Sequence, residues 1–322
     1  MSDYFCVSRE SAEEFMRLFV NRLAYGIQAA KPLPDGSVPY YLARHWPTKQ
    51  LKSLQPDVVR MHLNGDVTIN LYAINPKTQS CKWVAIDADF DGSLEALFHL
   101  QWELKQDGVD AALEQSRRGG HLWIFGETPL LASQCRLYIY NLALRLGVPV
   151  KGGGLKEGIE VFPRQDRIED GAYGNAIRAP IGVHRKNNRR YWFYEADVTP
   201  EAQLAYLQGL KKLTASELET LTQGMTLPQA YRSPEPMPFV SRVPIAGQRE
   251  FRILDYVQTT GKQDSRNWKA QCPSCAQGGR DRSGNNLGIK ISDPRFYVCR
   301  AGCTKEDIRA ALGQPVRKSV MA

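Results

Sequence analysis

The sequence predicts an α+β protein in three parts, with a mixed domain over residues 1–200, a helical, proline-containing connector over 201–260 and a small metal-binding domain over 261–322. Three observations support this division. Segments with strand and helix periodicity alternate as far as about residue 200. Four of the seven cysteines lie within the last quarter of the chain. From residue 241 onward there are 15 basic and 7 acidic side chains, so this part accounts for the whole formal charge of +8.

Length and composition are those of a folded protein without a membrane segment. At 322 residues and 43% hydrophobic content, the chain is long enough for about two domains with cores of their own. No apolar run approaches the ~18 residues that a membrane-spanning helix needs, and the start of the chain, Met1 to Tyr4, lacks a signal-peptide pattern. We therefore expect a cytoplasmic protein with no membrane partner, in a compartment where disulfides seldom persist.

The first elements are a helix, a strand and a second helix. Ser11 and Glu14 have the spacing of a capping box, and the apolar stripe after them ends near Gly26, which predicts an amphipathic helix. The run KWVAIDADF, Lys82–Phe90, is typical of a strand. Apolar residues at helical spacing over Leu94–Leu104 then predict a helix.

A hairpin and four further elements complete the mixed domain. Strands are expected at Ala111–Gln115 and His121–Phe125, with the turn RRGG between them. The remaining pattern predicts a helix at Leu131–Leu146, strands at Ile159–Phe162, Ile177–Val183 and Tyr191–Ala196, and helical structure at Pro200–Gly224. Beyond it, Ser233–Pro238 is the best linker candidate, because successive prolines stiffen the chain and lack backbone donors.

Three carboxylates in two of these strands predict a metal site. Side chains alternate along a strand, so Asp87 and Asp89 project to the same side, and a divalent cation would relieve their repulsion. Glu160 lies between apolar neighbours, where an unpaired charge is costly. If the strands are adjacent, the three acids form the oxygen-rich site that Mg²⁺ or Mn²⁺ prefers. A solvated acidic strand end is the alternative, and acidic dyads also occur in glycosyltransferases and nucleases.

Two basic segments predict phosphate binding. The hairpin turn brings together a hydroxyl, two guanidinium groups, glycine and histidine, in Ser116, Arg117, Arg118, Gly119 and His121. A second cluster of cations includes Arg178, His184 and Lys186. A plain hairpin turn and a solvated loop are the alternatives. Together with the carboxylates, the two segments describe a nucleotidyl-transfer site, because a triphosphate needs metal ions and cations around it.

The clustered cysteines predict a structural zinc site. Two residues separate Cys272 from Cys275 and three separate Cys299 from Cys303, which is the spacing of two zinc knuckles. A disulfide pair and an iron site are the alternatives. Because the segment is too short for a large core, bound Zn²⁺ would supply much of its folding free energy.

The acidic and basic motifs together resemble the archaeo-eukaryotic primase superfamily, particularly the primase-polymerases of plasmids, phages, CRISPR loci and TOTE conflict systems. The resemblance covers about residues 10 to 200 and rests on the ordered motifs IDADF, SRRGGHLW and GIEVFP. It implies a catalytic domain with an RRM-like sheet core. The carboxylates Asp87, Asp89 and Glu160 would then hold Mg²⁺ or Mn²⁺, and His121 would contact the triphosphate of the incoming nucleotide.

Two features extend or depart from this resemblance. The segment GNAIRAPIGVHRK is also similar to the family, which implies phosphate contacts for Arg178, Lys186 and His184. Arg117 stands where the family often has a small residue, so either Arg117 or Arg118 could face the site.

The C-terminal segment is similar to the zinc ribbon of bacterial-type primases and their phage relatives, in CPSC, DRSGNNLGIKI, FYVCRAGC and TKEDIRAALG. This resemblance implies a ribbon that aids template recognition and initiation. Basic residues surround the cysteines, with Phe296 and Tyr297 among them, and such a mixture can track a single strand's phosphates and stack its bases. We expect at least one of the two rings to fill the ribbon's core instead.

These features predict a DNA primase or primase-polymerase that makes primers on a single-stranded DNA template from nucleoside triphosphates (dNTPs, NTPs or both), by two-metal-ion nucleotidyl transfer. A helicase or another replication or defence protein could be its partner. Two alternatives stay open: a catalytically inactive module that binds single-stranded DNA, and another metal-dependent nucleotidyltransferase or nuclease that uses the same acids.

Overall fold

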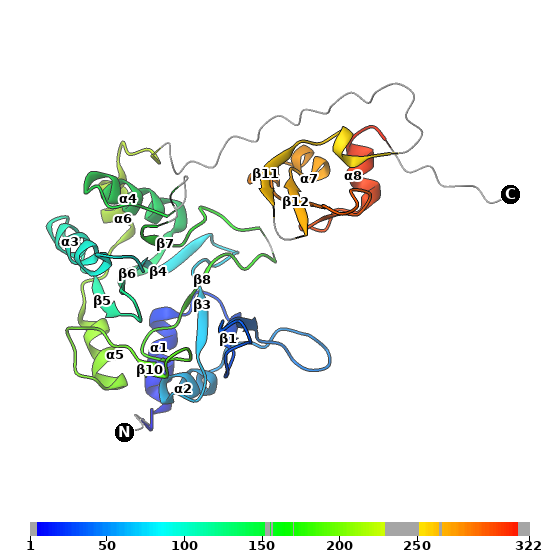
Figure 1. Ribbon diagram of the computed structural model, residues 1–322. Helices are drawn as coiled ribbons and strands as arrows, with labels where there is room; N and C mark the ends of the chain where they lie inside the picture. Colours follow the sequence, from blue (N-terminus) through cyan, green and yellow to red (C-terminus); the bar gives the residue numbers. More distant parts are fainter. Residues whose placement is uncertain are drawn as a thin grey trace. The chain divides into compact units, whose positions relative to one another are not determined.

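The chain divides into two compact units, residues 1–231 and 232–322 (Figure 1). The computed structural model describes residues 5–151, 155, 157–169, 171–228, 251–263 and 266–314, so the proline-containing segment 233–238 lies outside the described residues. Within those ranges, no helix is both long enough and apolar enough to cross a membrane.

The first unit is built on two four-stranded antiparallel sheets, which confirms the predicted α+β class. The first sheet has the order β2-β1-β3-β8, and the second has the order β5-β6-β4-β7. Two short strands, β9 and β10, pair separately. The elements are α1 (Arg9–Phe19), β1 (Tyr25–Gln28), β2 (Tyr40–Leu42), α2 (Pro56–Asn64), β3 (Ile69–Tyr72), β4 (Ser80–Ala88), α3 (Ser93–Gln106), β5 (Ala112–Gln115), β6 (Gly120–Leu131), α4 (Ala132–Arg145), β7 (Glu160–Phe162), β8 (Ala176–Arg178), β9 (Val183–His184), β10 (Arg189–Arg190), α5 (Pro200–Gly209) and α6 (Ala215–Thr222).

Side chains alternate along each strand of the second sheet, and both of its faces are buried, each in a different core. Val84 and Ile86 of β4 belong to a core shared with Leu97 of α3 and Tyr138 of α4. The alternate residues of β4, such as Trp83, belong to the other core, which includes α1 and the first sheet. Helices therefore cover one face of the second sheet, and the first sheet with α1 covers the other.

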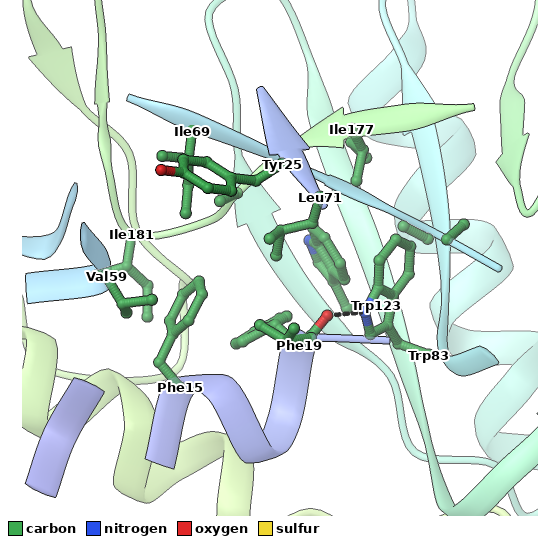
Figure 2. Close-up of a cluster of buried hydrophobic side chains, with 14 of the residues drawn as sticks. Phe15, Phe19, Tyr25, Val59, Ile69, Leu71, Trp83, Trp123, Ile177 and Ile181 are labelled. Carbon is green, nitrogen blue, oxygen red and sulfur yellow. Dashed lines mark hydrogen bonds between the residues drawn. The ribbon is translucent and has the colours of Figure 1, made fainter. Parts of the chain in front are cut away.

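Figure 2 shows the core that joins the two sheets, with rings from α1 against tryptophans of the second sheet. The ring centroids of Phe19 and Trp123 lie 5.3 Å apart. The indole Nε1 of Trp83 donates a hydrogen bond of 2.8 Å to the carbonyl oxygen of Phe19. Ile69 and Leu71 of β3 close the cluster from the first sheet (Figure 2). This packing holds the two sheets at a fixed distance from each other.

The first helix differs from its prediction at both ends. The N-cap is Ser8, whose Oγ accepts a hydrogen bond of 3.0 Å from the Ser11 N–H, so the capping box predicted at Ser11 and Glu14 is wrong. The helix ends at Phe19, and Gly26 lies in β1.

Two predicted strands also differ. The predicted strand over residues 177–183 is divided between β8 and β9, because Ile181 adopts a φ of 64° and turns the chain. The segment 191–196 is not a regular strand. It nevertheless lies along β5, where the Tyr194 N–H donates to the Leu113 carbonyl at 3.0 Å and the Gln115 N–H donates to the Trp192 carbonyl at 2.9 Å.

The helices after residue 200 belong to the first unit. Leu204 and Leu207 of α5 are buried in the core with α1, and Leu218 of α6 is buried in the core with α3 and α4. The division into units falls near residue 231, within the connector that the sequence predicts over 201–260.

The second unit is a four-stranded antiparallel sheet with two short helices. The strand order is β11-β12-β13-β14, and Tyr297 fills the small core while Phe296 is 56% exposed. The expectation that at least one of these rings fills the core is thus met by Tyr297. The elements are β11 (Thr259–Gln263), β12 (Asn267–Ala270), α7 (Pro273–Gln277), β13 (Leu287–Lys290), β14 (Tyr297–Cys299) and α8 (Lys305–Ala311), preceded by the 3₁₀ turn η2 (Ile253–Asp255).

Candidate active site and cysteine cluster

Four polar residues form one row across the second sheet. Asp87 of β4 lies directly opposite Glu160 of β7 on one side and His121 of β6 on the other. His121 in turn lies opposite Glu114 of β5. Because directly opposite residues share a face of a sheet, all four side chains lie on the face that carries Trp83 and Trp123. The four charged or polar side chains therefore lie next to the apolar core, on the same face of the sheet.

Three residues of the row, Asp87, His121 and Glu160, line a cavity of about 370 Å³. The lining includes all the predicted catalytic and nucleotide-binding residues except Gly119 and Lys186. From the second sheet and its turns come Asp87, Asp89, Glu160, His121, Ser116, Arg117 and Arg118; from the first sheet and β9 come Gln28, Tyr40, Arg178 and His184. Both arginines of the turn thus line the cavity.

The two predicted residues outside the lining have other positions. A Cβ atom on Gly119 would lie 2.1 Å from the Ala88 carbonyl oxygen, so only glycine lets this turn lie against the end of β4. The side chain of Lys186 is exposed, and its backbone N–H donates to Nδ1 of His184 at 3.2 Å.

Cations already neutralise two of the three carboxylates. Arg118 pairs with Asp89, and Lys151 pairs with Glu160. For Asp87, the one ion-pair partner among the described residues is His121, whose Nε2 lies 3.5 Å from Oδ1. Burial raises the pKa of Asp87, and the neighbouring carboxylates of Glu160 and Asp89 raise it further. Asp87 is thus the carboxylate at which an additional positive charge would be most stabilising.

Glu114 is a site residue that the sequence analysis missed. It is fully buried, and its Oε2 accepts hydrogen bonds from His121 Nδ1 at 2.7 Å and Trp123 Nε1 at 3.1 Å. Its Oε1 accepts a hydrogen bond of 2.8 Å from Arg178. Burial alone would raise the pKa of Glu114, but Arg178 and His121 outweigh it and lower the pKa to about 2. The Glu114 carboxylate therefore holds His121 with Nε2 toward Asp87.

Replacing Glu114 by glutamine should destabilise the first unit, because it leaves the buried Arg178 guanidinium without its counter-charge. We expect the free energy of unfolding to fall by about 3–5 kcal/mol. Urea denaturation followed by circular dichroism measures this change. The matched control is Glu127→Gln, at an exposed position on β6. Equal stability of the two variants would contradict the role given to Glu114.

Arg178 of β8 and His184 of β9 also line the cavity. Arg178 is 9% exposed, and its guanidinium is fixed by Glu114. Burial, together with the positive charges of Arg178 and Arg117, lowers the pKa of His184 to about 4. Since Nδ1 of His184 accepts the Lys186 N–H, the proton of the neutral ring is on Nε2. His184 thus offers a neutral hydrogen-bond donor beside an arginine.

In the second unit, the four cysteines converge as predicted. The four Sγ atoms all lie within 4.8 Å of one another, and Cys275 Sγ is 3.5 Å from Cys299 Sγ and 3.3 Å from Cys303 Sγ. Tetrahedral Zn²⁺ with Zn–S bonds of ~2.3 Å would separate the sulfurs by about 3.8 Å, so the donor set and its spacing fit zinc. Among the described residues, no other group of three or more Cys, His, Asp or Glu ligands converges this closely.

Asp281 organises the loop around the first cysteine pair. Its carboxylate is buried and accepts hydrogen bonds from the N–H groups of Cys272 at 2.8 Å and of Asn285 and Asn286 at 3.1 Å. On the opposite knuckle, the Ala301 N–H donates to Cys299 Sγ at 3.3 Å. Such contacts orient metal ligands before the metal binds.

Three solved structures are similar to this chain at low identity. The catalytic domain of primase RepB′ in complex with initiator DNA is 13% identical over 67% of this chain and 93% of that chain, with a TM-score of 0.33. Primase RepB′ is 11% identical over 67% and 62%, with a TM-score of 0.34. The polymerase domain from Mycobacterium tuberculosis ligase D in complex with DNA is 10% identical over 68% and 92%, with a TM-score of 0.27.

Similarity in sequence, and not these low TM-scores, shows the family of the chain. No curated protein matches the chain. Residues 37–221, more than half of the chain, match the family described as "TOTE conflict system, Archaeo-Eukaryotic Primase domain". This match includes the whole row from Asp87 to Glu160 and both sides of the cavity except Gln28. The chain belongs to the archaeo-eukaryotic primase domain family of TOTE conflict systems.

Proposed function

We propose that this protein builds primers on single-stranded DNA from nucleoside triphosphates, by template-directed nucleotidyl transfer that uses two divalent metal ions. The observation that carries the proposal is the pairing of Asp87 with Glu160 on adjacent strands, in one cavity with Arg178 and His184. The second sheet offers oxygen ligands for metal ions, and donors for phosphate oxygens come from its hairpin turn as well as from Arg178 and His184. A metal-bound nucleoside triphosphate requires both.

The three carboxylates supply the hard oxygen ligands that Mg²⁺ and Mn²⁺ prefer. Asp87, Asp89 and Glu160 would hold the ions, and Arg118 and Lys151 would leave their present carboxylate partners as the ions bind. Once bound, the ions would favour ionisation of the attacking 3′ hydroxyl and offset the charge of the leaving pyrophosphate.

Three other residues of the lining would bind and orient the nucleotide. Arg178 and the Nε2–H of His184 would contact the triphosphate, together with Arg117 of the hairpin turn. Glu114 fixes Arg178 and His121 at once, so the nucleotide would meet donors that are already oriented. No rearrangement of these buried groups would then be needed when the nucleotide arrives.

The second unit would bind Zn²⁺ through its four cysteines and contact the template. Phe296 is 56% exposed, and the ammonium groups of Lys290 and Lys305 lie 5.3 Å and 5.7 Å from its ring centroid. An exposed ring between cations is suited to a base and its flanking phosphates. We assign to this ribbon a role in starting primers.

The proposed activity is tested by gel analysis of labelled products on unprimed single-stranded DNA, with ribo- or deoxynucleotides and with Mg²⁺ or Mn²⁺. We expect short products that require a metal ion, and the sugar that supports them identifies the primer as RNA or DNA. Absence of products with intact DNA binding would favour an inactive binding module. Shortening of the DNA without nucleotides would favour a nuclease.

A further inference from the structure

The loop that follows β2 carries the most exposed large hydrophobic side chain among the described residues. Trp46 has 81% of its surface exposed. Leaving most of an indole ring in water forgoes the free energy of its burial, and the exposed part of the ring is available to stack on a ligand. We call residues 43–52 the Trp46 loop.

The Trp46 loop is held in a defined shape by hydrogen bonds across it. The His45 N–H donates to the Gln50 carbonyl at 2.8 Å, and the Lys52 N–H donates to the Ala43 carbonyl at 3.0 Å. The Arg44 guanidinium donates to the Lys49 carbonyl at 2.7 Å. The ring is thus presented on an ordered hairpin, and little conformational freedom would be lost when a ligand binds.

The charged side chains in and next to the Trp46 loop along the chain are all positive. Residues 36–56 contain Arg44, Lys49 and Lys52 but no aspartate or glutamate. None of the three cations takes part in an ion pair between described residues. The Lys49 ammonium lies 3.6 Å from the centroid of the Trp46 ring, so one face of the indole already carries a cation. The loop therefore complements a polyanion that also presents flat rings.

Strand β2 connects the Trp46 loop to the cavity. Tyr40, at the start of β2, lines the cavity, and Trp46 is six residues further along the chain. Six residues span at most about 20 Å. A single DNA strand with one nucleotide at the cavity can therefore contact the Trp46 loop a few nucleotides away.

We propose that the Trp46 loop binds the single-stranded template, with one base stacked on Trp46 and with Arg44, Lys49 and Lys52 facing its phosphates. Exposed aromatic rings between cations bind single strands without sequence preference, because every base has a flat face. The proposal rests on the proposed function in one respect, since it takes the strand to be the template.

The test measures binding of fluorescein-labelled single-stranded DNA to the full chain by fluorescence anisotropy, without nucleotides. We expect Trp46→Ala to weaken binding about 5- to 100-fold and Trp46→Phe to retain most of the affinity. The matched control is Trp102→Ala, a tryptophan of α3 that is 58% exposed, which should bind as the wild type does. On an oligonucleotide of abasic sites, Trp46→Ala and wild type should bind alike.

The cations have a separate readout. Because each phosphate contact contributes about 0.7 to the slope of log affinity against log salt for a single strand, Lys49→Ala and Lys52→Ala should each make the slope shallower by about that amount. Unchanged slopes in both variants would remove the cations from the proposal.

Equal affinities for Trp46→Ala and Trp102→Ala would overturn the proposal. That result would leave the proposed function untouched, because the measurement involves no synthesis. The opposite result is also distinguishable. If the wild type makes no primers and Trp46→Ala still binds DNA more weakly than the wild type, the proposed function is refuted and the binding site is supported.

Discussion

Replacing Asp87 by asparagine should abolish nucleotide incorporation on a primed template, with a rate at least about a thousandfold lower. The asparagine side chain would keep the shape of the aspartate but lose the charge that holds a metal ion, and that ion supplies several kcal/mol of stabilisation to the transition state. The fold should survive, because burial already disfavours the charged form of Asp87. Extension of a labelled primer, followed over time on a gel, measures the loss.

Asp91→Asn is the matched control for this experiment. Asp91 lies two residues after Asp89, is exposed and does not line the cavity, so its substitution removes the same charge from the surface only. We expect it to extend primers at the wild-type rate. A variant Asp87→Asn that extends primers as fast as Asp91→Asn would exclude the carboxylate row as the catalytic site.

Replacing Cys272 by serine should remove zinc from the protein and unfold the second unit. Structural Zn²⁺ contributes about 10–16 kcal/mol to the folding of small domains, which is as large as the whole stability of a typical domain. The core of this unit is small, so it cannot compensate for the loss. Metal analysis together with limited proteolysis of the second unit reports both effects.

The control is Cys6→Ser, which changes an exposed cysteine of the first unit and should retain zinc. With Cys272→Ser we also expect de novo priming to fall more than extension of a supplied primer. Equal loss of both activities would show that the ribbon serves general folding or DNA retention instead of initiation. A full equivalent of zinc in soluble Cys272→Ser protein would refute the four-cysteine site.

The second sheet could be predicted because its strands carry strong local signals. The runs around Asp87 and Glu160 are apolar and bounded by turn residues, and the RRGG turn identifies a hairpin. The four residues between the paired strands are 116–119, one position before the predicted RRGG, so Gln115 pairs with Gly120 and Glu114 lies opposite His121. A turn at RRGG would instead place Ser116 opposite His121, so the turn signal alone does not identify Glu114.

The first sheet could not be predicted in the same way. Its strands β1, β2 and β3 are three or four residues long and lie outside every predicted strand, and of this sheet only β8 overlaps one, the strand predicted over 177–183. Strands this short have too little pattern to separate them from loops, and β1 and β3 are stabilised instead by burial of Tyr25, Ile69 and Leu71 in the core that contains α1. Consequently Gln28 and Tyr40, which line the cavity from this sheet, gave no signal in the sequence.

The most direct test of the account is a crystal structure with Mn²⁺ and a non-hydrolysable nucleoside triphosphate, in which anomalous scattering locates the ions. We expect two Mn²⁺ peaks roughly 3.5–4 Å apart, bound by Asp87, Asp89 and Glu160. The triphosphate should lie against Arg178 and His184. Manganese or triphosphate bound elsewhere, with these carboxylates still paired to Arg118 and Lys151, would contradict the account.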